Sequence, residues 1–92
     1  MEGTPPNVDL NEITKIIENV KGVKRIYDLH VWTITSGQNM LSCHVVVDDT
    51  LTVKAAGEIS LRIKKELEQK GIYHVTIQME GEEYAQFNQH EH

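Results

Sequence analysis

The order in which hydrophobic periodicity changes along the chain constrains the fold more than any other feature. Apolar residues first recur at helical spacing, then give way to two β-branched runs, a second helical stretch and a final alternating run. The order α-β-β-α-β predicts an α+β domain with a three-stranded mixed sheet and two helices on one face. The helical stripes are Leu10, Ile13, Ile16, Ile17 and Val20, then Val53, Ala56, Ile59, Ile63 and Leu67.

Capping and turn residues predict where these elements begin and end. Asp9 precedes the first helix as an N-cap, and Gly22 follows it as a stop. Thr50 or Thr52 can cap the second helix, which runs to about Lys70. The strands are expected at 23–35, 40–47 and 72–80, with a turn at 36–39 joining the first two into a hairpin.

Side-chain alternation divides each strand between the two faces of the sheet. Leu41, Cys43, Val45 and Val47 form an apolar set that suits the side covered by helices. A buried structural thiol is therefore the expected role of Cys43. Met40, Ser42, His44 and Val46 face the other side, and so does the polar set His74, Thr76, Gln78 and Glu80 of the last strand.

His44 and the polar set of the last strand thus share the face that no helix is left to cover. Parallel neighbouring strands would bring them within reach of each other. An imidazole and a carboxylate on one exposed face suit a zinc-type site, because both bind borderline divalent ions. The alternative is that each is simply a polar residue on an exposed strand.

Composition excludes several classes of function. The chain has 92 residues and one cysteine, which fits one domain without an internal disulfide. Nine Lys and Arg face fourteen Asp and Glu, and the basic residues of the second helix alternate with Glu, so nucleic acid is not an expected partner. The longest apolar run is residues 45–47, far below the ~20 residues of a membrane span. No phosphate loop or nucleophile elbow is present, and we expect no enzyme.

The domain is expected to occupy residues 9–81. Residues 1–8, with two adjacent prolines, are expected to form an extended linker. Residues 82–92 are polar and are expected to be a flexible tail, although Tyr84 and Phe87 can pack. His90 and His92 lie in that tail and are expected to do nothing specific. His30, beside Trp32, is expected to be a hydrogen-bonded strand histidine.

Four short motifs in order are more specific than these patterns. They are EGTP at 2–5, DLHVW at 28–32, LSCHV at 41–45 and TIQME at 76–80. Together they resemble the cytoplasmic C-terminal domain of the cation diffusion facilitator family, which exports zinc and related divalent metals. The resemblance covers nearly the whole chain, from residue 2 to about residue 81.

The resemblance implies a metallochaperone-like (ferredoxin-like) αββαβ fold and a homodimer formed through the sheet side, with metal bound near that interface. It also implies that residues 1–8 follow a transmembrane domain in a longer protein of the cell membrane, and that this chain is its cytoplasmic part. The expected metal is zinc, or cadmium, cobalt, manganese or iron.

The resemblance further implies which residues hold the metal. His44 matches a histidine ligand of several members, and Glu80 matches an acidic ligand. His74 lies near the position of a further histidine and can substitute for it. Tyr27, Gly57 and Gln78 stand where some relatives have histidine, which implies a sparser site. Two other functions stay open: a purely structural dimerisation module, and a free-standing metal chaperone, which would lack the usual CxxC.

Overall fold

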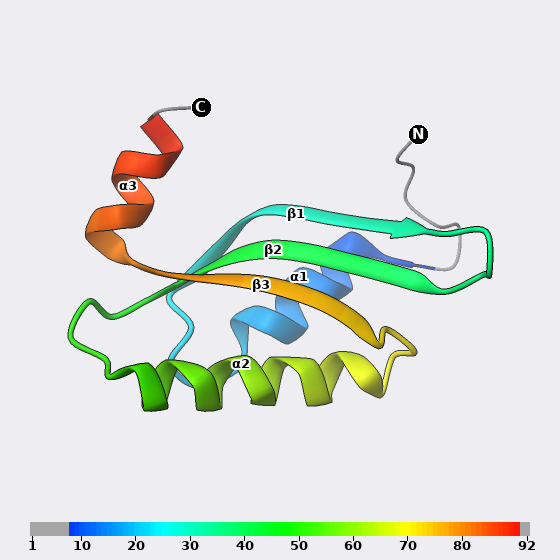
Figure 1. Ribbon diagram of the computed structural model, residues 1–92, viewed down its shortest axis with the longest axis horizontal. Coiled ribbons are helices and arrows are strands. Elements are labelled where there is room, and N and C mark those ends of the chain that lie inside the picture. Colours follow the sequence, from blue (N-terminus) through cyan, green and yellow to red (C-terminus); the bar gives the residue numbers. More distant parts are fainter. Residues whose placement is uncertain (1–7, 91–92) are drawn as a thin grey trace.

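The computed structural model describes residues 8–90, and its elements follow the predicted order with one addition. A sheet and two helices are made by the first five elements, and a third helix follows the last strand directly (Figure 1). The bounds are α1 Leu10–Glu18, β1 Arg25–Thr33, β2 Asn39–Val47, α2 Val53–Glu68, β3 His74–Gly81 and α3 Glu82–His90. No helix in this part of the chain is long and apolar enough to cross a membrane.

The three strands form one sheet in the order β1-β2-β3. β1 and β2 are antiparallel, as expected for a hairpin, and β2 and β3 are parallel neighbours joined through α2. Both α1 and α2 lie on the same side of the sheet (Figure 1). The predicted mixed sheet with two helices on one face is therefore confirmed.

Side chains cap both helices at their N-termini. Asp9 accepts hydrogen bonds from the backbone N–H groups of Asn11 and Glu12, at 2.9 and 3.4 Å. Thr52, rather than Thr50, caps α2, because its Oγ1 accepts from the N–H of Ala55 at 3.0 Å. These bonds satisfy amides that have no partner within the helix, which fixes where each helix begins.

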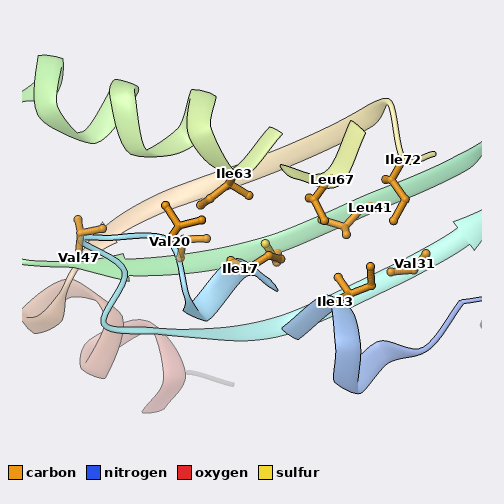
Figure 2. Packing of buried hydrophobic residues seen from close by; sticks show 11 residues of the cluster. Ile13, Ile17, Val20, Val31, Leu41, Val47, Ile63, Leu67 and Ile72 are labelled. Atoms are coloured by element: carbon orange, nitrogen blue, oxygen red, sulfur yellow. The ribbon is translucent and has the colours of Figure 1, made fainter. Parts of the chain in front are cut away.

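The core lies between the sheet and the two helices. Figure 2 shows side chains of α1 and α2 interleaved with those of the strands, among them Ile17, Ile63 and Leu67, all with no exposed surface. The predicted inward set of β2 (Leu41, Cys43, Val45, Val47) is buried throughout and belongs to this cluster. Alternation therefore assigned the faces of β2 correctly.

The third helix corrects two predictions. Residues 82–90 are helical rather than an irregular tail, and α3 lies on the opposite side of the sheet from α1 and α2, over one end of the face expected to be open (Figure 1). Ala85 of α3 and Val46 of β2 are both fully buried there. Residues 91–92, the end of the predicted tail, lie outside the described residues. So do residues 1–7, which make up most of the predicted linker.

Tertiary contacts explain why the sequence did not reveal α3. Its nine residues are mostly polar and carry little apolar periodicity, so the helix would be marginal alone. The N–H of Glu83 donates to Oδ1 of Asp49, in the loop after β2, at 3.3 Å. The amide at the start of α3 is thus satisfied by a residue more than thirty positions away.

Replacing a buried residue of α2 tests the core. Ile63→Ala should lower the free energy of unfolding by about 2–5 kcal/mol, because it leaves a cavity in a close-packed interior. Leu61→Ala, on the same helix but 55% exposed, should change it by less than about 0.5 kcal/mol. Urea unfolding followed by circular dichroism measures both; equal losses would contradict the assignment of the α2 faces.

Candidate functional site

Five side chains gather where α3 covers the sheet. They come from three strands and the helix, and we call them the Glu80 cluster: Tyr27 of β1, His44 of β2, Gln78 and Glu80 of β3, and Asn88 of α3. The side chain of Glu80 has no exposed surface, whereas that of His44 is 22% exposed. Burying a carboxyl destabilises the folded state unless hydrogen bonds compensate for its lost hydration. The hydrogen-bond partners of Glu80 therefore explain how it can be buried.

Both oxygens of the Glu80 carboxyl are engaged. Oε2 lies 2.5 Å from Nδ1 of His44 and accepts from Nε2 of Gln78 at 2.6 Å and from Nδ2 of Asn88 at 3.4 Å. Oε1 accepts from the hydroxyl of Tyr27, which itself accepts from Nδ2 of Asn88 at 2.8 Å. The His44 and Tyr27 rings stack with centroids 4.6 Å apart. The cluster is therefore a closed hydrogen-bonded network.

Strand register places the members of the network. His44 pairs with Gln78 across β2 and β3, and Tyr27 pairs with His44 across β1 and β2. Glu80 lies two residues beyond Gln78 and so on the same face. These three strands therefore present their side chains to one point, as parity predicted for His44 and Glu80.

A β-bulge is what brings Tyr27 to this face. The register shifts between Tyr27 and His30, and Asp28 within the shift has a φ of +53°, in the left-handed region. An extra residue in one strand reverses the facing of everything before it. Without the bulge, Tyr27 would face the same way as Val31, which is buried in the core.

An ion pair beside the cluster forms a second link between β1 and α3. Arg25 of β1 contacts Glu82 of α3 at 3.1 Å, and its guanidinium lies 5.8 Å from the centroid of the Tyr27 ring. The hydrogen bond from Arg25 holds the pKa of Glu82 below its usual value. Burial, followed by the hydrogen bond to Glu80, raises the pKa of Tyr27. Tyr27 therefore stays protonated at neutral pH, and its hydroxyl donates a hydrogen bond to Glu80.

The structure brings His44 and Glu80 together but leaves His74 apart. His74 pairs with Met40 at the far end of β3, six positions from Glu80. Six residues of strand span about 20 Å, so His74 does not join the pair within one chain. The predicted grouping of all three is corrected for this reason: they share a face, but not a place along the strand.

Other candidate residues lie away from the pair or face inward. Cys43 is buried in the core, and burial raises the pKa of its thiol to about 12. His30 lies on the same face as His44, where both line a hollow of about 230 Å³ beside the Glu80 cluster. His90 ends α3 and its side chain, like His92, lies outside what is described.

The donor chemistry fits a divalent metal only in part. Imidazole nitrogen and carboxylate oxygen are ligands that zinc accepts, at about 2.0–2.2 Å. Among residues 8–90, however, no group of three His, Cys, Asp or Glu side chains is arranged to hold an ion. His44 and Glu80 thus supply two ligands, and water or a second chain would have to complete the coordination.

Comparison with known proteins identifies the family. Residues 5–82 match the family model described as the cytoplasmic domain of cation efflux proteins. The chain is 54% identical over 88 residues to the cadmium, cobalt and zinc/H⁺-K⁺ antiporter of Bacillus subtilis, covering 96% of this chain and 28% of the relative. It is 43% identical over 81 residues to the metal cation efflux system protein CzcD of Cupriavidus metallidurans, covering 87% and 25%.

A solved structure agrees with the fold. The metal-bound C-terminal domain of the CzcD transporter from Cupriavidus metallidurans superposes with a TM-score of 0.70 at 42% identity, over 78% of this chain and 97% of that one. This chain therefore belongs to the cytoplasmic domain family of cation efflux proteins, and its fold is the metallochaperone-like one of that family's C-terminal domains. It spans about a quarter of the length of the curated relatives it matches.

Removing the Tyr27 hydroxyl tests the network. Tyr27→Phe should lower the free energy of unfolding by about 1–3 kcal/mol, because the buried Glu80 carboxyl loses a donor. Tyr73→Phe is the matched control, since Tyr73 is 69% exposed, and should stay within about 0.5 kcal/mol. Denaturant unfolding at pH 7 measures both. An unchanged midpoint for Tyr27→Phe would contradict the network.

The raised pKa of Cys43 predicts a slow thiol. At pH 8 the native protein should react with iodoacetamide far more slowly than the same protein in 6 M guanidinium, because the thiolate is the nucleophile and this thiol stays protonated and buried. Mass spectrometry of timed samples follows the alkylation. Equal rates in the two states would show that Cys43 is accessible.

Proposed function

We propose that this chain is the cytoplasmic regulatory and dimerisation domain of a divalent cation efflux transporter. It binds a zinc-type ion through His44 and Glu80 near the dimer interface and so stabilises the transport-competent dimer. The observation that carries this proposal is the meeting of His44 Nδ1 and Glu80 Oε2, 2.5 Å apart, on the sheet face away from α1 and α2. Neither catalysis nor nucleic acid binding is part of the proposed role.

The relatives support the transporter setting. One relative is named for the antiport of cadmium, cobalt and zinc and another for metal cation efflux; both match most of this chain but are about four times as long. We propose that a transmembrane domain of the same protein precedes this domain in the cell membrane, carries the ion across, and is this domain's partner. Manganese and iron are further ions that imidazole and carboxylate ligands permit.

The dimer provides the means of regulation. Two copies would associate through the uncovered part of the sheet face, so that His44 and Glu80 lie near the contact. A tetrahedral zinc site needs four ligands, and one chain provides two. An ion bound near the junction biases the dimer only by the difference between its affinities for the two states. The C-terminal domain of CzcD is known in a metal-bound form, which is consistent with this mechanism.

Isothermal titration with zinc tests the site. His44→Ala should weaken zinc binding by at least ten-fold, because even an outer-shell partner of a metal ligand is worth about ten- to hundred-fold. His74→Ala is the matched control, a histidine of the same face near the far end of β3, and should leave the dissociation constant within about two-fold. Affinity should also fall from pH 7.5 to pH 5, as an imidazole ligand is protonated.

Sedimentation with and without zinc measures the dimer in the same samples. Association that strengthens with zinc in the native protein, and not in His44→Ala, is the expected result. Zinc binding that both histidine variants leave unchanged would remove the proposed site.

A structural dimerisation module is the second candidate, and one observation favours it. The Glu80 carboxyl has four hydrogen-bond partners from the protein itself, Tyr27, His44, Gln78 and Asn88. In that case the dimer would form equally well in the presence of a chelator, and His44→Ala would leave the association unchanged.

A further inference from the structure

Helix α3 lies almost entirely beyond the end of the family model. The match ends at residue 82, and α3 comprises Glu82–His90. α3 nevertheless makes specific contacts with the rest of the domain. Glu82 pairs with Arg25, the N–H of Glu83 donates to Asp49, and Ala85 is fully buried. The helix is thus docked at several points along its length.

The last of these contacts reaches the proposed ligands. Nδ2 of Asn88 donates to Tyr27 Oη at 2.8 Å and to Glu80 Oε2 at 3.4 Å. The helix therefore encloses the same carboxyl that we propose as a metal ligand, and it contributes to leaving that side chain without exposed surface.

An ion at the His44–Glu80 pair has to replace hydrogen bonds that hold the Glu80 carboxyl. Two ligands of one tetrahedral zinc, each at about 2.0–2.1 Å, lie about 3.3 Å apart, whereas Nδ1 and Oε2 are 2.5 Å apart. Three nitrogen atoms already lie within hydrogen-bonding distance of Oε2, those of His44, Gln78 and Asn88, whereas a carboxylate oxygen has two lone pairs, so an ion on Oε2 competes with these contacts. The contact with Asn88, at 3.4 Å, is the longest of the three, and we expect the ion to displace it.

We propose that α3 is a lid over the His44–Glu80 pair, docked in the metal-free domain and released when a divalent cation binds there. The proposal rests on the metal site proposed above and adds that α3 and the ion compete for the same carboxyl. Linkage then requires reciprocity: the factor by which the ion weakens docking of α3 is the factor by which undocking of α3 tightens the ion.

The structure of α3 suits a detachable element. Nine residues are too few for an independently stable helix, so its order depends on docking. Its outer side carries Tyr84 and Phe87, which are 53% and 63% exposed and contribute little to holding it. The strand before it ends at Gly81, where a Cβ would come within 2.1 Å of Asp49 Oδ1, so only glycine allows Asp49 to reach the start of α3.

Two substitutions loosen the lid without changing either ligand. Asn88→Ala removes the donor to Glu80, and Ala85→Gln forces a larger neutral side chain into a fully buried position and undocks the helix by another route. Each should lower the zinc dissociation constant about ten-fold, which corresponds to about 1.4 kcal/mol. Gln89→Ala, an exposed amide next to Asn88, is the matched control and should leave it unchanged.

Hydrogen exchange of the whole chain supplies an independent measurement. Saturating zinc should raise the exchange rates of the α3 amides, residues 83–90, about ten-fold in the native protein and leave those of β2 slow. Circular dichroism of each variant without zinc reports that the rest of the domain remains folded.

The outcomes separate the lid from the site. Tighter zinc binding in Asn88→Ala and Ala85→Gln, with faster α3 exchange on zinc addition, supports the lid. Zinc binding that depends on His44 but leaves α3 exchange unchanged overturns the lid and leaves the proposed function standing. Failure of the native protein and both loosened variants to bind zinc overturns the metal site itself, and the lid with it.

Discussion

The hydrogen bonds of the buried Glu80 carboxyl hold the polar face of the sheet and helix α3 together. Withdrawing this carboxyl from water requires compensating partners, and these come from every strand and from α3: Tyr27, His44, Gln78 and Asn88. The network therefore links elements far apart in sequence at one point. A movement of the Glu80 carboxyl therefore changes its hydrogen bond to Asn88 of α3.

The two faces of the sheet differ in the side chains that they carry. The face against α1 and α2 is filled by apolar side chains and provides stability, with Ile17, Ile63 and Leu67 at its centre (Figure 2). The opposite face carries the polar cluster at one end under α3 and the hollow lined by His30 and His44 beside it. A domain of this size has a thin core, and here that core lies on one face of the sheet.

Periodicity and parity were sufficient for most of the fold. The helical stripe of α1, the alternation of β3 and the capping by Asp9 are local signals, and the structure follows them. His44 and Glu80 were also placed on one face correctly, because strand alternation is a fixed two-residue period. His74 satisfies the same parity, yet it lies about 20 Å along the strand, because parity fixes the face and not the position.

The sequence by itself determined the order of the first five elements, the apolar face and the family, since each depends on short-range pattern or on motifs read in order. Only the tertiary structure decided that Tyr27 and Asn88 would enclose the Glu80 carboxyl. The bulge at Asp28 turns Tyr27 toward Glu80, and long-range contacts with Asp49 and Arg25 order α3 over the cluster. No local pattern encodes these features, because the stability of a short polar helix and the facing of a bulged strand arise from partners distant in the chain.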